Sequence, residues 1–309
     1  MSRGYRFGMR IGIFSGTTND GTLDQLLAEA KAAEAEGFAG FWVSQIFGHD
    51  ALTVLAVIGR EVPRIELGTG VVPTYPRHPV MLAQQALTVN AASGGRLALG
   101  IGLSHKVVIE NLLGLSYDKP VRHLREYLSV LMPLVEGRPV GFIGEEFKVH
   151  AGISVPGSSR PGVFVAALGE QMLRVTGALA DGTVTWCTGP ATLRDHTVPT
   201  LRAAAEAAGR PAPRVIAALP VCVTEDRGAA SERAAKIFQM YGQLPSYRAM
   251  LDKEGVAGPE DIAIIGTEAE VGDRVLALAD VGVTDFTAAE FGANPDEAAR
   301  TRELLKSLI

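Results

Sequence analysis

The run Ala167-Leu168-Gly169-Glu170-Gln171 leads from an apolar, strand-like stretch through one glycine directly into a helical pattern. The first N–H groups of a helix have no partner inside the helix, and the helix dipole adds positive charge there. A turn of this kind can therefore bind a phosphate without a basic side chain. An ordinary strand-to-helix turn is the alternative, and Glu170 suits a phosphate only if its carboxylate points outward.

The segment from Gly68 to Pro79 is a second candidate, because it joins a glycine-rich strand end to a loop with three prolines. Glycine at a strand end permits close approach of a ligand to the backbone, and the prolines stiffen the chain that follows. Tyr75 places a hydroxyl group in this loop. Arg77 could bind a ligand anion, although pairing at the surface is the commoner role of an arginine.

Three histidines, His49, His78 and His105, each follow an apolar stretch. We predict no metal site, because the chain has no His-x-His or His-Glu-x-x-His motif and no carboxylate at ligand spacing. An imidazole exchanges protons near neutral pH, so His105 is a candidate proton donor. The other histidines are expected at the surface: His123, His150 and His196.

The composition argues against several classes of partner. The 309 residues are 47% hydrophobic and 20% charged, with a net charge of −5 and no long run of either sign. Nucleic acids and anionic membranes both need clustered positive charge, so neither is an expected partner. No stretch reaches the roughly 20 apolar residues of a membrane helix. Cys187 and Cys222 are predicted to be buried thiols of a cytoplasmic protein.

Several common catalytic motifs are missing from the sequence. Gly100-Ile101-Gly102 lacks the third glycine and the acidic residue of a dinucleotide-binding motif. The chain contains no P-loop, no Gly-x-Ser-x-Gly and no Cys-x-x-Cys. Kinase, hydrolase and thiol-redox activities therefore lack their usual anchors.

Eight apolar stretches that are typical of strands alternate with helical patterns along the chain. The expected strands are residues 10–14, 38–44, 65–72, 96–103, 163–167, 183–187, 214–223 and 283–286. The main expected helices are residues 22–36, 51–61, 79–92, 122–136, 171–180, 193–208, 271–280 and 297–308. Continuous apolar strands between helices indicate a parallel sheet covered on both faces. We predict a (β/α)8 TIM barrel, with an open doubly wound sheet as the alternative.

Two longer connections interrupt this alternation. Residues 137–160 are rich in glycine and proline and are expected to form a loop with a small hairpin near residues 142–149. The roughly 60 residues between the seventh and eighth strands exceed an ordinary connection and predict a helical insertion. Residues 1–9 are expected to form a disordered extension, and residues 10–309 a single domain. In a TIM barrel, the residues that follow the strands form the functional face.

The stretch LGTGVVPTYPRHPVMLAQQALTVNAASGGRLALGIGLS, residues 67–104, resembles the luciferase-like flavin and deazaflavin oxidoreductases, and more closely the branch that uses coenzyme F420. Residues 33–45, 163–182 and 275–291 carry further similarity, so the resemblance covers nearly the whole chain. It implies a TIM barrel with a flavin-like cofactor at its open end. A homodimer is also expected, because dimers are common on this scaffold.

The resemblance further implies where the cofactor is held. A cis non-proline peptide would lie at Gly70-Val71 and form a bulge behind the deazaflavin ring, and the phosphate would lie at the helix start after Leu168. The cofactor-binding residues that it implies, besides Gln45, are Gly70, Val71, Val72, Gly102, Ser104, His105, Ala167, Leu168, Gly169, Glu170 and Gln171.

The chain departs from its family pattern after the second strand. Related alcohol and sugar-phosphate dehydrogenases carry Trp-x-x-Asp-His there, whereas this chain has Trp42-Val43-Ser44-Gln45-Ile46. A glutamine can hydrogen-bond a cofactor but cannot accept a proton at neutral pH. The departure favours a reductase over an alcohol or sugar-phosphate dehydrogenase.

We therefore predict an F420-dependent oxidoreductase that transfers a hydride between reduced deazaflavin and a small organic substrate. The pocket is expected to be mostly apolar and closed by residues 137–160 and 226–265. An FMN-dependent luciferase-like monooxygenase is the first alternative, and a non-catalytic cofactor-binding barrel is the second. The candidate catalytic residues, as proton donors or polar contacts, are Gln45, His49, Tyr75 and His105.

Overall fold

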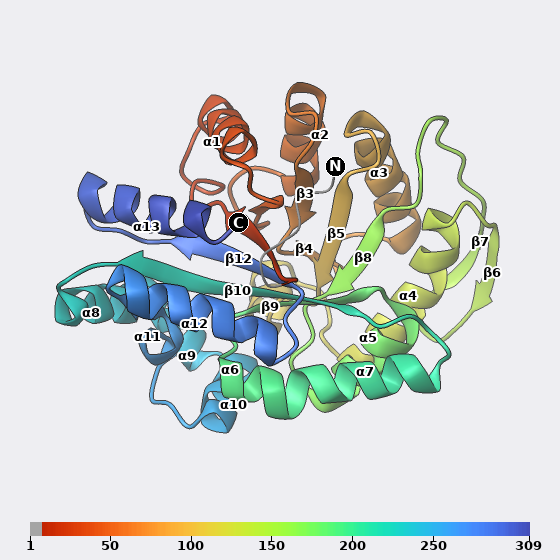
Figure 1. The fold of residues 1–309 in the computed structure, drawn as a ribbon. Coiled ribbons are helices and arrows are strands. Elements are labelled where there is room, and N and C mark those ends of the chain that lie inside the picture. The colour runs from red at the N-terminus through yellow and green to blue at the C-terminus, as the bar shows by residue number, and fades with distance from the viewer. Residues whose placement is uncertain (1–7) are drawn as a thin grey trace.

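A closed parallel barrel surrounded by helices forms the body of the protein in a computed structural model that describes residues 8–309 (Figure 1). The extension expected at residues 1–9 lies outside the described residues, apart from Gly8 and Met9. Met9 is buried against the barrel core, directly before the first strand.

Eight strands close the barrel by parallel pairing. β10 pairs with β9 on one side and with β12 on the other, and β12 pairs with β1, which completes the ring. The TIM barrel predicted from the sequence is confirmed. The barrel strands are β1 (Arg10–Phe14), β2 (Gly40–Val43), β3 (Glu66–Thr69), β5 (Leu97–Gly102), β8 (Gly162–Val165), β9 (Gly182–Trp186), β10 (Arg214–Val223) and β12 (Asp285–Glu290).

Two of the expected strands differ from the observed ones. The expected strand at residues 65–72 is interrupted by a cis peptide at Gly70-Val71, so that β3 ends at Thr69 and a short β4 (Val72–Pro73) follows. The eighth strand begins later than expected and continues to Glu290. Its last residues, Ala-Ala-Glu, have low strand propensity, but pairing with β1 and β10 on both sides outweighs that preference.

The barrel helices begin and end at sequence signals. The first starts at a capping box between Thr22 and Gln25 and ends at Gly37, whose φ of 94° only glycine adopts readily. The principal helices are α1 (Leu23–Glu36), α2 (Ala51–Glu61), α3 (Pro79–Ala92), α4 (Pro120–Val135), α5 (Glu170–Leu179), α7 (Val198–Ala207), α12 (Glu268–Asp280) and α13 (Pro295–Ser307).

The helix expected at residues 193–208 is two pieces rather than one, and a short helix precedes them. The chain forms α6 (Pro190–Thr192), then a π-helical turn (Leu193–Thr197), and only then α7. A second π-helical turn, Val107–Leu112, follows β5. A one-residue change of hydrogen-bond spacing leaves the apolar periodicity nearly intact, so the sequence pattern does not reveal it.

The insertion between the seventh and eighth barrel strands consists of short helices and one extra strand. These are α8 (Arg227–Ile237), α9 (Gln239–Gln243), α10 (Pro245–Glu254), α11 (Pro259–Ile262) and β11 (Ile264–Gly266), which pairs with β10. The Glu254 carboxylate accepts the backbone N–H groups of Ala191 and Thr192, at 3.0 and 2.6 Å. One insertion side chain therefore caps the start of α6.

The predicted hairpin is present as antiparallel β6 (Val140–Ile143) and β7 (Lys148–Ala151). It packs against α4 at the edge of the molecule (Figure 1). The carboxylate of Glu126 on α4 accepts the backbone N–H groups of residues 145, 146 and 147 at 3.0, 2.9 and 3.1 Å. These bonds hold the hairpin turn against α4, and closure of the pocket by residues 137–160 stays a prediction.

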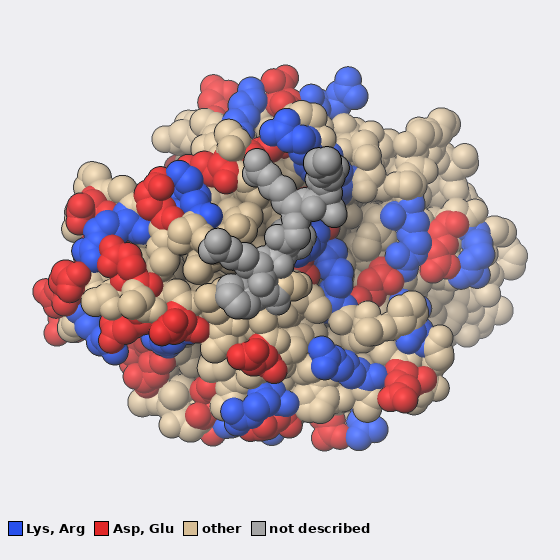
Figure 2. Space-filling view, in the orientation of Figure 1, with Lys and Arg blue, Asp and Glu red and all other residues tan. Residues whose placement is uncertain are grey.

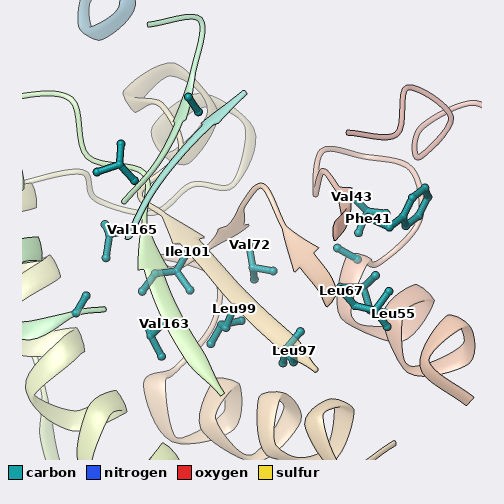
Figure 3. Packing of buried hydrophobic residues seen from close by; sticks show 14 of the residues in the cluster. Phe41, Val43, Leu55, Leu67, Val72, Leu97, Leu99, Ile101, Val163 and Val165 are labelled. Atoms are coloured by element: carbon teal, nitrogen blue, oxygen red, sulfur yellow. The ribbon is translucent and has the colours of Figure 1, made fainter. Parts of the chain in front are cut away.

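Alternate residues of each strand face two different cores. On β5, Leu97, Leu99 and Ile101 join the large cluster beneath the helices (Figure 3), whereas Ala98 joins a smaller cluster inside the barrel. On β8, Val163 and Val165 likewise face the helices and Phe164 faces inward. This period of two is the geometry of a strand buried on both faces.

Four charged residues meet at the starts of four barrel strands. Arg10 and Arg214 both bond Glu66, at 2.7 and 2.8 Å, and both pair with Asp285. The guanidinium of Arg214 also lies 4.8 Å from the centre of the Phe164 ring. We call these residues the basal quartet, because they close the end of the barrel at which its strands begin.

The face of the molecule that Figure 2 shows carries mixed charge. Lys and Arg side chains alternate with Asp and Glu over the face shown in Figure 2, with no broad area of one sign. None of the helices in residues 8–309 is long and apolar enough to cross a membrane. Cys187 and Cys222 are buried free thiols, as predicted.

Candidate active site

The start of α5 is open, as a phosphate site requires. Gly169 is the N-cap, and no side chain in residues 8–309 caps this helix end. A Cβ atom at Gly169 would meet no atom within 4 Å, and Gly169, Glu170 and Gln171 are all exposed. The side chain of Glu170 turns along the helix to Arg174, with its Oε1 2.6 Å from the Arg174 Nη2. The Glu170 carboxylate is thereby drawn away from the helix start. The sequence alone did not decide the direction in which this carboxylate points.

Arg174 and Lys253 supply positive charge near this helix start, and the His196 ring lies beside them. Arg174 is the main reason that the pKa of Glu170 is lowered, and His196 and Lys253 add to the effect. The Nε2 of His196 lies 2.8 Å from the Leu168 carbonyl oxygen. His196 is half-buried rather than a surface residue, which corrects the sequence-based expectation, because the π-helical turn directs it toward the end of β8. An anion at Gly169 would thus meet free N–H groups and nearby cations.

The cis peptide at Gly70-Val71 is present as the family resemblance implied. The Gly70 N–H donates to the carbonyl of Val43 on β2 at 2.8 Å, and a Cβ at Gly70 would lie 2.5 Å from the Phe14 ring. A Cβ at Gly102 would lie 2.6 Å from the Val71 side chain. These two glycines therefore make room for Phe14 and Val71, so the bulge is packed between neighbouring strands.

The implied cofactor residues do not all face the same way. Val71 is half-buried and packs with the inner barrel cluster, whereas Val72 is buried among the residues beneath the helices. Ala167 is also buried in that outer core, and Leu168 is half-buried. The structure places Val71, Gly102 and the start of α5 toward the barrel interior or its open end.

Ser104 and His105 follow β5 at the open end of the barrel. Ser104 has a φ of 59°, an uncommon backbone conformation for a residue other than glycine. The ring centre of His105 lies 5.7 Å from that of Tyr247 on α10. Burial lowers the pKa of His105, so its imidazole is neutral near pH 7.

Gln45 and His49 are engaged within the protein. The Gln45 Oε1 accepts the backbone N–H of Ala51 at 2.8 Å, beside Asp50, which caps α2. The His49 Nε2 lies 2.9 Å from the Gly21 carbonyl oxygen. The Arg77 guanidinium forms an ion pair with Asp50 at 2.6 Å. Arg77 therefore has the structural role that is common for arginine. These contacts order the loop after β2.

Tyr75 is held in a stack of three rings. Its ring lies parallel to that of His123, with centres 3.9 Å apart and planes 5° apart, and Tyr117 covers the other face at 5.0 Å. Its hydroxyl is buried without a hydrogen-bond partner among residues 8–309. Burial, then Tyr117 and nearby carboxylates, raise the pKa of Tyr75 well above its usual value, so the phenol stays protonated.

His123 is buried, which corrects the expectation that it lies at the surface. Only 4% of its surface is exposed, because the β6–β7 hairpin covers this face of α4. The apolar periodicity of α4 could not reveal this burial, because the residues that cover the helix face lie about 20 positions further along the chain. His150 is exposed, as expected, and His78 is exposed and caps α3.

An aromatic cluster at the ends of β1 and β9 was missed by sequence reasoning. Trp186 stacks on Phe14 with ring centres 5.6 Å apart, and meets Phe238 and Tyr241 of the insertion edge to face, each at 5.7 Å. Its indole nitrogen is buried without a partner among the described residues. The sequence signal available for this cluster was the position of Trp186 directly at a strand end.

A cavity of about 370 Å³ lies beside Phe14, between β1, β12, α1 and α13. Its wall includes Glu29, which accepts a hydrogen bond from the Ser15 hydroxyl at 2.6 Å. Glu290 and Arg302, which form an ion pair, also line it. Residues 8–309 contain no cluster of His, Cys, Asp and Glu suited to a metal.

The sequence of residues 9–285 matches the family model described as luciferase-like monooxygenase. The chain belongs to this family. The resemblance stated from the motifs at residues 67–104 is thereby confirmed.

Relatives of the luciferase-like chain include a 5,10-methylenetetrahydromethanopterin reductase from Methanolobus tindarius, 26% identical, with 88% of this chain and 92% of the relative covered. The structure of a coenzyme F420-dependent tetrahydromethanopterin reductase from Methanopyrus kandleri has the same fold, with a TM-score of 0.81, 21% identity, and coverage of 97% of this chain and 98% of that one.

An F420-dependent secondary alcohol dehydrogenase, solved with an F420-acetone adduct, has a TM-score of 0.79, 18% identity, and coverage of 97% of this chain and 98% of that one. The fold is also shared by a Baeyer-Villiger monooxygenase component of Pseudomonas putida in complex with FMN, with a TM-score of 0.74, 15% identity, and coverage of 96% of each chain.

Proposed function

We propose that this protein is an F420-dependent oxidoreductase that acts as a reductase on a small organic substrate. The observation that carries the proposal is the open helix start at Gly169, which lies at the functional end of a luciferase-like barrel. Full-length similarity to a methylenetetrahydromethanopterin reductase and the fold shared with an F420-dependent reductase support F420.

The residues at the open end fit such a cofactor. The N–H groups at the start of α5, with His196 and Lys253 nearby, would hold its phosphate. Two buried donors that have no hydrogen-bond partner within residues 8–309, the Trp186 indole N–H and the Tyr75 hydroxyl, are available to ligand oxygens. Unpaired buried donors are rare in folded proteins, so a ligand that pairs them is favoured.

When bound, F420 supplies a deazaflavin ring that carries a hydride. His105 would hold or deliver the proton that accompanies it, because its imidazole lies after β5 at the open end. The rings of Phe14, Trp186 and Tyr241 would keep water from the reacting atoms. Gln45 and His49 would act by ordering the loop after β2, since their polar atoms already bind backbone groups.

An FMN-dependent monooxygenase is the second candidate, because a relative of the same fold binds FMN and an open helix start suits either phosphate. A barrel that binds a cofactor without turning it over is the third. The first experiment is therefore equilibrium binding of purified apoprotein to F420 and, separately, to FMN, followed by fluorescence quenching.

We expect tight binding of F420 and weak binding of FMN. Preference for FMN would replace the proposal with the monooxygenase, and oxygen consumption would then be measured. Binding of F420 without reoxidation of its reduced form by any of a panel of imines and enones would favour the non-catalytic barrel. Binding of neither cofactor would overturn the assignment of the Gly169 site.

A further inference from the structure

His123 connects the loop after the cis peptide to the outer hairpin by hydrogen bonds at both ring nitrogens. Its Nδ1 lies 2.8 Å from the Glu146 Oε2, and its Nε2 lies 3.0 Å from the Thr74 hydroxyl. Burial lowers the pKa of His123, so the imidazole is neutral near pH 7 and carries a single proton. Because the Glu146 carboxylate accepts, Nδ1 donates to it and Nε2 accepts the Thr74 O–H. The imidazole is thus fixed in one tautomer.

The same imidazole fixes Tyr75. The two rings are nearly parallel, 3.9 Å apart at their centres, and Tyr117 closes the stack from the other side. The Tyr117 hydroxyl donates to the Ser104 carbonyl at 3.3 Å. The stack therefore joins the loop after β4 to the loop after β5, and both loops carry proposed cofactor contacts.

The chain between His123 and the bulge is short and buried. Thr74 is 1% exposed, its backbone N–H donates to the Gly102 carbonyl at 2.9 Å, and it follows β4 directly. Only Val72 and Pro73 separate Thr74 from Val71. A shift of Thr74 would therefore move the bulge, with little chain between them to absorb the change.

We propose that His123, oriented by Glu146, is a positioning residue that sets the place of the Gly70-Val71 bulge and of the Tyr75 hydroxyl for the bound cofactor. The inference rests on the proposed function, since it concerns the same site. His123 acts through Thr74 and Tyr75, and the hairpin that carries Glu146 becomes part of the cofactor site's support.

The test compares F420 binding by wild type, His123→Phe and Thr74→Val. His123→Phe keeps a ring against Tyr75 but loses both hydrogen bonds, and Thr74→Val removes one hydroxyl at nearly constant volume. We expect each to raise the Kd for F420 roughly tenfold, since small misplacements at a site are costly. The double variant should have a Kd for F420 about equal to that of the weaker-binding single variant, because both changes break the same hydrogen bond between His123 and Thr74. His123→Gln, which retains an amide for Thr74, should recover part of the affinity.

A matched control lies at the opposite end of the barrel. Asn90 is buried and bonds the Ser159 carbonyl and the Leu97 N–H, at 2.7 and 3.0 Å. Asn90→Ala should lower the midpoint of thermal unfolding without changing the Kd for F420 by more than about twofold. This control separates loss of positioning from general loss of stability.

The outcomes distinguish the two proposals. If wild type binds F420 and folded His123→Phe binds it equally well, the positioning role is overturned and the proposed function stands. If wild type binds FMN instead, the same variants are compared with FMN, and an unchanged Kd overturns the positioning role there. If wild type binds neither cofactor, both proposals fall.

Discussion

The guanidinium of Arg214 on β10 lies 2.8 Å from the carboxylate of Asp285 on the neighbouring strand β12. The same nitrogen lies 2.8 Å from Glu66 on β3, which is not a neighbour of either strand in the sheet. The ion pair therefore links strands across the barrel as well as along its wall. It occupies the end of the barrel where a layer of apolar side chains would otherwise be expected.

Replacement of Arg214 by methionine should destabilise the protein strongly. Loss of Arg214 leaves Glu66 and the buried Asp285 to share the single guanidinium of Arg10, so we expect a cost of up to about 3 kcal/mol in the free energy of unfolding, measured by urea denaturation. Lys31→Met is the control, because Lys31 and Glu61 form an exposed pair at 3.3 Å and should matter by less than about 1 kcal/mol. Equal effects of the two changes would show that the basal quartet contributes no more than a surface pair.

Gly169→Asp should change stability and binding in opposite directions. A Cβ is accommodated at Gly169, and an aspartate there would cap α5, so stability should rise by a few tenths of a kcal/mol or more. The same carboxylate would occupy the N–H groups and repel a phosphate, so the Kd for F420 should rise at least roughly tenfold. Gly169→Ser, an uncharged cap, should weaken binding less. An unchanged Kd for Gly169→Asp would place the phosphate elsewhere.

His105 should give the reductase reaction its pH dependence. Because burial lowers the pKa of His105 below 6.5, the protonated form grows only as the pH falls through that lowered value. If this form donates the proton, kcat should rise as the pH falls. In His105→Gln we expect kcat to drop by about 100-fold or more, with loss of the inflection. An inflection that persists in His105→Gln would assign the titration to another group.

Glu126 should make the hairpin sensitive to acid. Burial raises the pKa of Glu126, but the three backbone N–H bonds from the hairpin outweigh it and lower the pKa below 4.5. The stabilisation is therefore complete above pH 4.5 and is lost as the pH falls through the lowered value. Glu126→Gln should cost about 1.5–3 kcal/mol at neutral pH. Its unfolding free energy should also fall less steeply with acid than that of wild type.

Glu145→Gln provides the comparison for this prediction, since Glu145 is exposed on the same hairpin and pairs with Arg122. We expect Glu145→Gln to lower the free energy of unfolding by less than about 1 kcal/mol. The idea that Glu126 holds the hairpin fails if limited proteolysis near residues 143–148 is no faster in Glu126→Gln than in Glu145→Gln.

The barrel was predictable because its signals are local. Alternating apolar stretches and helices specify the order of elements, and Gly37 and Thr22 mark the ends of one helix. The family motif at residues 67–104 also predicted the cis peptide at Gly70-Val71. Each of these depends on residues close together in the chain.

The parts that were missed depend on contacts between distant residues. His123 is buried only because a hairpin folds back over α4, and two of the ring partners of Trp186 come from an insertion about 50 residues further along the chain. Gln45 and His49 were candidates by type and position, but their polar atoms meet Ala51 and Gly21 in the folded chain. Neither result follows from periodicity or spacing.

The cap that Glu254 places on α6 also bears on how such barrels can be recombined. An insertion that supplies a cap to the barrel wall is not an interchangeable module, because its removal leaves two backbone N–H groups of the wall without acceptors. A chimaera that exchanges residues 226–265 for the insertion of another barrel should therefore preserve a carboxylate at this point. Suitable donors for such an exchange are relatives whose insertion carries this carboxylate and whose barrel has the same turn at the position of Gly189.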